Sequence, residues 1–217
     1  MRANSLDRSA LTGITAAVIG AAIALAAAGC GTSTPPAQAN GSGSTSSPHA
    51  MPSHSHSMRG SAAFGPDCSR VPGSGMGSFH GMSMDPVVTA ARHNPLLTSF
   101  AADVMKAGLT ADLNAMHAIT VFAPANSAFG AMDQADMTML HGHGELAKVL
   151  RYHIVNGRVT PEELASGKSL KTLEGGTLTG AKMGSVYEVD NAHVICGNIH
   201  TANATIYVIS KVLIPMH

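Results

Sequence analysis

Histidine and methionine side chains gather in one stretch of the N-terminal third of the chain. His49, Met51, His54, His56 and Met58 are interspersed with serine, proline and alanine, and the whole chain holds 12 histidines and 13 methionines. Imidazole and thioether are ligands that suit copper, above all Cu(I), and a flexible chain can wrap them around an ion. Further ligand types follow at Met76, His80, Met82 and Met84. Two interpretations are open: weak copper or zinc capture, or a solvated linker, which we favour because no folded second shell is evident.

Tyr152 and His153 are the strongest candidates for acid–base chemistry in the second half of the chain. An imidazole at the end of a helix and against a strand could serve as a general base. No Gly-x-Ser-x-Gly elbow, paired carboxylates or acid partner at a recognisable spacing accompanies it. We therefore expect a buried, hydrogen-bonded histidine and no enzymatic activity. His141 and His143 could ligate a metal, but the glycines beside them favour a plain loop.

Cys30 marks a candidate lipidation site. Arg2 and Arg8 precede an uncharged apolar run that ends in Ala27-Ala28-Gly29-Cys30, and this order is typical of an export signal, residues 1–29. The Gly-Cys ending predicts a lipoprotein anchored to the cell membrane through the Cys30 sulfur. The alternative is an uncleaved membrane helix, because the apolar run is long enough to span a bilayer once. Both interpretations place the rest of the chain outside the cytoplasm.

The chain has three cysteines in all. If Cys30 carries lipid, Cys68 and Cys196 are left as a single possible pair, whose bond would require an oxidising compartment. Two buried free thiols or a metal pair are the alternatives, although the absence of a Cys-x-x-Cys motif argues against a zinc knuckle.

Residues 30–81 differ in composition from the rest of the exported chain. Glycine, serine, threonine, proline and alanine dominate them, and apolar periodicity is missing, so we predict a disordered tether. Removing residues 1–29 takes away two arginines and one aspartate, which leaves 11 basic and 12 acidic residues and a net charge of −1. No basic stripe and no phosphate-cradling glycine loop is present, so we expect neither nucleic acid nor a nucleotide as partner.

Short helices are predicted in the first half of the remaining domain, residues 82–217. Asp85-Pro86 and Asn94-Pro95 each resemble a helix start, and the second helix should bury one face that includes Phe100 and Met105 before it stops at Gly108. Further helical segments are expected at residues 109–113, 133–140 and 145–153. Thr160-Pro161-Glu162-Glu163 has the form of a capping box.

Strands dominate the second half of the domain. Residues 119–123 form a β-branched and aromatic run, and short strands are expected at 169–173, 176–180, 185–189, 192–195, 199–201 and 204–209. Helices followed by strands predict an α+β fold. We expect the helices to pack on a wedge of two small, mostly antiparallel sheets. Asn203-Ala204-Thr205 matches a glycosylation acceptor, but Ala204 begins a core strand, so we expect no modification there.

Three segments together resemble the fasciclin (FAS1) domain. They are residues 120–129 (TVFAPANSAF), residues 152–155 (YHIV) and residues 203–215 (NATIYVISKVLIP), in the order and spacing of the two end motifs and the central Tyr-His of that family. The sequence GMSMDPVV at residues 81–88 and the positions of Cys68 and Cys196 are similar to those of the mycobacterial fasciclin surface antigens.

The resemblance implies a structural role for the motif residues. They are Thr120, Phe122, Pro124, Asn126, Phe129, Tyr152, His153 and Tyr207. It implies that His153 is a buried hydrogen-bonding post near the first end motif, with Asn126 or Ser127 as its partner. It also implies a lipid-anchored, non-enzymatic surface antigen, without a cofactor, that mediates adhesion or contact with host or cell envelope through an unknown protein or glycan partner. We expect a monomer. The alternative function is an extracytoplasmic metal-handling lipoprotein that uses the His/Met tract.

Overall fold

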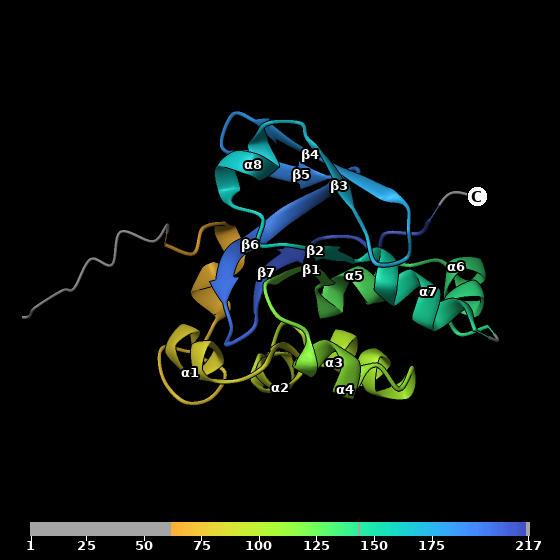
Figure 1. The fold of residues 1–217 in the computed structure, drawn as a ribbon, viewed down its shortest axis with the longest axis horizontal. Helices are drawn as coiled ribbons and strands as arrows, with labels where there is room; N and C mark the ends of the chain where they lie inside the picture. The colour runs from red at the N-terminus through yellow and green to blue at the C-terminus, as the bar shows by residue number, and fades with distance from the viewer. Residues whose placement is uncertain (1–61, 143, 216–217) are drawn as a thin grey trace, which may run out of the picture. The chain divides into compact units, whose positions relative to one another are not determined.

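The computed structural model describes residues 62–142 and 144–215, in which helices come first and strands dominate later (Figure 1). The helices are the 3₁₀ helix η1 (Pro66–Arg70), α1 (Phe79–Met84), α2 (Val87–His93), α3 (Thr98–Lys106), α4 (Thr110–Ala115), α5 (Asn126–Gly130), α6 (Gln134–Leu140), α7 (Glu145–Tyr152) and α8 (Pro161–Ala165). The strands are β1 (Ile119–Pro124), β2 (Ile154–Asn156), β3 (Ser169–Lys171), β4 (Thr177–Met183), β5 (Val186–Val189), β6 (Ala192–His200) and β7 (Ala204–Ile209). The α+β class is confirmed. None of the described helices is both long and apolar enough to cross a membrane.

The strands form one seven-stranded sheet with the order β2-β1-β7-β6-β5-β4-β3. The pair β1–β7 is parallel and the other pairs are antiparallel. The two end strands meet at a single bridge between Val155 and Thr172, so the sheet nearly closes on itself. The prediction of two small sheets is therefore wrong. The sequence suggested two strands where β6 lies, at residues 192–195 and 199–201. In the structure β6 continues through two register shifts and so joins both halves of the sheet.

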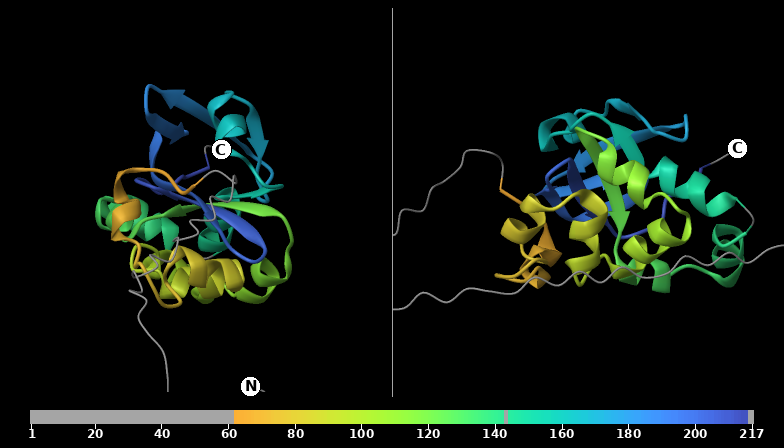
Figure 2. Two further views of the ribbon diagram at one scale, coloured as in Figure 1. Left: turned by 90° about the vertical axis from the view of Figure 1, so that its left-hand side faces the viewer. Right: turned by 60° about the horizontal axis from the view of Figure 1, so that its bottom comes forward.

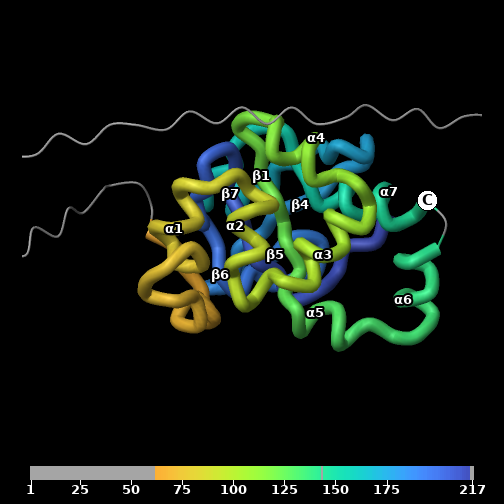
Figure 3. Tube along the Cα trace, turned by 90° about the horizontal axis from the view of Figure 1, so that it is seen from below, coloured from red at the N-terminus to blue at the C-terminus, as the bar shows by residue number. Residues whose placement is uncertain are grey.

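The curled sheet buries residues on both of its faces. In β1, Val121 and Ala123 pack toward the helices, whereas Phe122 points into the curl with Tyr207 of β7. Figures 2 and 3 show α1 to α4 lying together over one side of the sheet, and Figure 2 shows α8 on the other side. Because both faces are covered, β1 and β7 are buried at every position and read as continuous apolar runs.

Residues 62–81 belong to the folded unit, so the predicted tether is wrong for this part. Phe64 pairs with Gly197 of β6, and its ring lies 4.5 Å from that of Tyr187. Glycine is frequent here because the backbone packs closely: a Cβ at Gly81 would come within 2.3 Å of the Gly75 carbonyl oxygen. The remaining tether residues, 30–61, and the signal segment 1–29 lie outside the described residues.

Local signals in the sequence predict several of the helix ends, although the helix expected from Asn94-Pro95 begins only at Thr98. Gly108 follows α3 with a left-handed φ of 72°, and Thr160 and Glu163 form the expected capping box. The helix expected from Asp85-Pro86 begins one residue later, with Pro86 as its N-cap. Met105 was expected in the buried face of α3, but its side chain is 48% exposed.

Candidate functional site

The two end motifs of the sequence lie side by side in the centre of the sheet. β1 and β7 pair in register from Ile119 with Ala204 to Pro124 with Ile209. Phe122 is fully buried, and its ring centroid lies 5.6 Å from that of Tyr207. Phe129 of α5, just beyond β1, is also buried. The motif residues of these strands therefore serve the core and present no reactive group to solvent.

His153 follows α7 and is almost completely buried, at 1% exposure. The backbone N–H of Leu213 donates to Nε2 over 3.0 Å, so Nε2 is the unprotonated nitrogen. Nδ1 then carries the proton and donates to the carbonyl oxygen of Val149 over 2.8 Å. The His153 carbonyl oxygen in turn accepts a hydrogen bond from the N–H of Phe122. His153 thus joins α7, β1 and the C-terminal segment.

Burial lowers the pKa of His153 from 6.5 to about 4, and the hydrogen bond to Val149 opposes that change only in part. The ring is therefore neutral at pH 7, and both of its nitrogens are engaged with backbone groups. A proton acceptor needs a free lone pair that faces a substrate. His153 offers none, so the geometry supports the predicted structural role. The expected partner was wrong: the imidazole binds Leu213, not Asn126 or Ser127.

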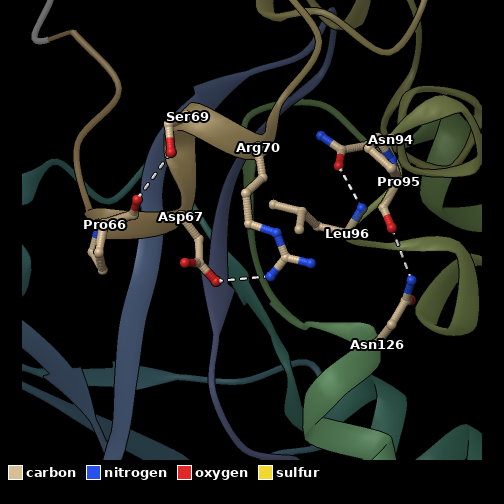
Figure 4. Close-up of polar contacts among 8 residues, drawn as sticks. All are labelled: Pro66, Asp67, Ser69, Arg70, Asn94, Pro95, Leu96 and Asn126. Atoms are coloured by element: carbon tan, nitrogen blue, oxygen red, sulfur yellow. Dashed lines mark hydrogen bonds and ion pairs between the residues drawn. The ribbon is translucent and has the colours of Figure 1, made fainter.

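Asn126, the first residue of α5, instead ties that helix to the start of α3, and Figure 4 shows its bond to Pro95 just before α3. Its Nδ2 donates to the carbonyl oxygen of Pro95 over 2.8 Å and to Thr98 Oγ1 over 2.9 Å. Its Oδ1 accepts from the N–H of Ser99 over 2.9 Å. Because that N–H is one of the unpaired donors at the N-terminus of α3, Asn126 supplies a cap from a distant part of the chain.

Thr120 and Tyr207 hold the segment that follows β2. Thr120 Oγ1 donates to the carbonyl oxygen of Gly157 over 2.7 Å and accepts from the N–H of Val159 over 2.8 Å. The Tyr207 hydroxyl donates to the carbonyl oxygen of Val159 over 2.8 Å, and burial raises the pKa of this phenol. Two buried side chains therefore satisfy the backbone of one turn, which fixes where the chain leaves β2.

Tyr152 lies at a more open position than His153. Its hydroxyl lies 3.2 Å from the carbonyl oxygen of Thr177 and 3.2 Å from Asp190 Oδ2. Burial, followed by the Asp190 carboxylate, raises the pKa of Tyr152 to about 12. Tyr152 and Asp190 border a groove of about 520 Å³. The Tyr152 phenol therefore stays protonated and hydrogen-bonded to the Asp190 carboxylate. A protonated phenol is a poor nucleophile.

Asn203 has a structural role that the sequence motifs did not predict. It is buried at 5% exposure; its Oδ1 accepts from the N–H of Val87, and its Nδ2 donates to the carbonyl oxygens of Leu113 and Met116, each over 2.8 Å. The amide thus caps α2 and the end of α4 from the start of β7. The expectation that Asn203 is no glycosylation acceptor agrees with this burial. The only sequence signal for this role is an asparagine just before a buried strand, and asparagine occupies that position in many ordinary turns.

Cys68 and Cys196 form a disulfide with a Cα–Cα distance of 4.9 Å and a sequence separation of 128 residues. It attaches η1 to β6 at the point where Phe64 also pairs. Figure 4 shows this 3₁₀ helix with the ion pair between Asp67 and Arg70, whose atoms lie 3.3 Å apart. The free-thiol and metal alternatives for these cysteines are excluded by this bond. It stabilises the N-terminal boundary of the folded unit.

The described residues contain no group of three or more His, Cys, Asp or Glu side chains that could hold a metal ion. Met82 is fully buried and its Sδ accepts from Asn94 Nδ2, so it cannot join the other methionines on the surface. His141 Nδ1 lies 2.9 Å from Lys106 Nζ. The candidate ligands His49, Met51, His54, His56 and Met58 lie outside the described residues, as do His143 and the lipidation candidate Cys30.

The fold and these contacts define a class of protein in which paired end motifs and a buried Tyr-His serve as a framework. The family model described as "Fasciclin domain" matches residues 95–215. The chain therefore belongs to the fasciclin domain family.

Among its relatives are two mycobacterial surface and immunogenic proteins. The "Cell surface glycolipoprotein MPB83" of Mycobacterium bovis is 37% identical over 147 residues, which span 65% of this chain and 66% of that protein, just under two thirds. The "Immunogenic protein MPB70" of the same species is 36% identical over 160 residues, 70% of this chain and 81% of that protein. A solved FAS1 domain pair from the insect cell adhesion molecule fasciclin I aligns at 21% identity over 55% of this chain and 45% of that chain, with a TM-score of 0.47.

Proposed function

We propose that this protein is a non-enzymatic interaction module, displayed outside the cell membrane through a lipid on Cys30. The observation that carries the proposal is the state of the Tyr-His pair. Both nitrogens of His153 bind backbone groups, and the Tyr152 hydroxyl lies against a carbonyl oxygen and a carboxylate. The His153 nitrogens and the Tyr152 hydroxyl thus hold the fold together and do not face a substrate. We therefore infer that the protein acts by binding a partner through its surface.

Three further features support the surface location. The relative MPB83 is named a cell surface glycolipoprotein. The Cys68–Cys196 disulfide is a bond that persists in oxidising compartments. The Ala27-Ala28-Gly29-Cys30 ending follows an apolar run, as in lipoprotein signals. A single acyl chain gives marginal anchoring, whereas two or more hold a protein stably in a membrane.

Metabolic labelling with an alkyne fatty acid tests the anchor in cells that express the full chain. We expect the label on the wild-type protein and in the membrane fraction, and its loss after Cys30→Ala, with the variant released to the medium. Cys68→Ala with Cys196→Ala is the matched control, since it removes two cysteines and leaves the lipidation site. A wild-type protein that stays unlabelled yet remains in the membrane would indicate the retained helix instead.

A second candidate function, metal handling, is favoured by the His/Met tract of residues 49–58. Calorimetric titration of Cu(I), Cu(II) and Zn(II) into residues 31–217 and into residues 60–217 tests it. The shorter protein keeps every described residue of the fold, because those begin at residue 62. Tight, stoichiometric binding by the longer protein alone would assign metal handling to the tract, and equal or negligible binding by both would refute this candidate.

A further inference from the structure

The two end strands of the sheet meet at one point and then separate. Val155 and Thr172 form a single bridge, and the N–H of Leu173 donates to the carbonyl oxygen of Ile154 over 2.7 Å. Continuing that register would place Asn156 opposite Lys171 and Ser169 opposite Arg158. The described strands make no such pairing. A groove of about 660 Å³ lies between them instead, which we call the β2–β3 groove.

One wall of the β2–β3 groove is the free edge of β3. Backbone groups in an antiparallel pair face alternately toward one neighbour and the other. The N–H of Thr172 donates toward the β4 side, to Gly176, whereas that of Leu173 donates to β2. Ser169 alternates with Thr172 as Leu173 does, so its backbone N–H and carbonyl oxygen point away from β4, toward the groove. An unpaired edge of this kind is a template for another extended segment.

The groove carries positive charge. Arg158, Lys168 and Lys171 line it and are exposed, and none of the three makes a salt bridge to a described carboxylate. Glu163 is the acidic residue of the lining, and its Oε2 accepts the N–H of Thr160 in the capping box. The Arg158 guanidinium is directed away from β3, because it donates to the carbonyl oxygen of Ala204 on β7 over 3.2 Å. Lys168 and Lys171 remain as exposed cations beside the strand edge of β3, and they favour an acidic occupant.

We propose that the β2–β3 groove binds an extended acidic peptide segment of a partner protein, which adds to the edge of β3. This inference rests on the proposed interaction function and names its site and the chemistry of its partner. The chain's own N-terminal segment is a poor occupant, since residues 30–61 contain no aspartate or glutamate. Backbone bonds to Ser169 would supply the register, and acidic side chains would face Lys168 and Lys171.

The probe is a fluorescein-labelled peptide of three Glu-Thr repeats, titrated by fluorescence anisotropy into the full chain in detergent. We expect binding that weakens with added salt and at least tenfold on Lys168→Glu with Lys171→Glu. The matched control, Lys182→Glu with Lys211→Glu, reverses two exposed lysines away from the groove and should change affinity less than twofold. Equal effects of the two double variants, or no binding by the wild type, would overturn the proposal.

A second measurement separates strand addition from simple anion binding. The same peptide methylated on alternate backbone nitrogens keeps its charge but loses edge hydrogen bonds, and we expect it to bind at least tenfold more weakly. Ser169→Pro removes one N–H that faces the groove and should have a similar effect; the methylated peptide decides the question if this variant does not fold. Equal binding of the methylated and unmethylated peptides, or equal displacement of both by inorganic phosphate, would indicate a simple anion site and refute the proposal of strand addition. Labelling of Cys30 tests the anchor separately, so the two proposals can fail independently.

Discussion

Lowering the pH should destabilise this domain through His153. Burial holds the folded-state pKa at about 4 against 6.5 for a free imidazole, and no charged side chain contributes to this shift. The unfolded chain therefore binds more protons between these values, so the stability is fully present above pH 6.5 and is lost as the pH falls through the folded pKa. The free energy of unfolding should fall by about 2 kcal/mol at pH 5, and by about 3 kcal/mol once the pH is well below 4. Protonation at Nε2 would also break the hydrogen bond from Leu213.

Urea unfolding at pH 7.5 and pH 5.0, followed by circular dichroism, measures this loss. With a urea m-value of about 2 kcal/mol/M, the wild-type midpoint should fall by about 1 M. His153→Gln removes the titrating group, so this variant should be less stable at pH 7.5 but lose about 2 kcal/mol less than the wild type on acidification. His200, whose pKa is lowered by partial burial and then by Arg158, is removed in a second control, His200→Gln.

The reasoning would be refuted by parallel pH profiles of the wild type and His153→Gln. Such a result would mean that the imidazole is protonated in the folded state or that another group dominates acid unfolding. Nitrogen-15 spectra of the ring supply an independent check. They should show the Nδ1–H tautomer at pH 6 with no titration down to pH 5, and an imidazolium signal in that range would contradict the buried neutral ring.

Three other changes have effects that follow from single contacts. Replacing Cys68 and Cys196 together by alanine should cost up to about 5 kcal/mol, from the loop entropy of the 128-residue separation, and guanidinium unfolding without reductant measures it. Asn203→Ala should cost about 2–4 kcal/mol, since it leaves a buried N–H, a buried carbonyl oxygen and a partly buried one without their partner. Hydrogen exchange should show α2 and α4 opening first, and an unchanged pattern would count against this capping role. Thr120→Val keeps the shape but removes both bonds to the turn after β2, so thermal unfolding should show a loss of about 1–3 kcal/mol, and a neutral result would contradict the assigned turn contacts.

The helices were predictable where a local signal controls the backbone. Gly108 and the Thr160–Glu163 capping box act within a few residues, so their consequences appear in the sequence directly. The sheet was less predictable because β6 bends without ending. Asn198 adopts a positive φ of 57° within that strand, and the sequence Cys196-Gly197-Asn198 resembles a break between two strands. Only pairing with β7 on one side and β5 on the other shows that the strand continues.

The motif residues were predicted as structural, but their partners were not. Asn126 and His153 are 27 residues apart, and a pairing between them was plausible from their motif positions. In the structure each satisfies a different chain segment: Asn126 binds Pro95, Thr98 and Ser99, and His153 binds Val149 and Leu213. Hydrogen-bond partners of this kind depend on loops that no local pattern fixes. The same holds for the segment 62–81, where a few contacts from Phe64 and Cys68 outweigh a composition typical of a linker.

The distribution of polar atoms decides where recognition can occur on this domain. Every described buried side-chain nitrogen or oxygen has a hydrogen-bond partner, so changing one of them costs stability before it changes binding. Residues 156–158 and 168–171 differ in this respect, because the sheet opens there and exposed cations stand beside a free strand edge. A charge reversal at Lys168 or Lys171 breaks no buried contact, and surface changes of this kind alter stability by about 0.5 kcal/mol or less. Binding partners can therefore be tested at this groove without disturbing the framework that the family motifs build.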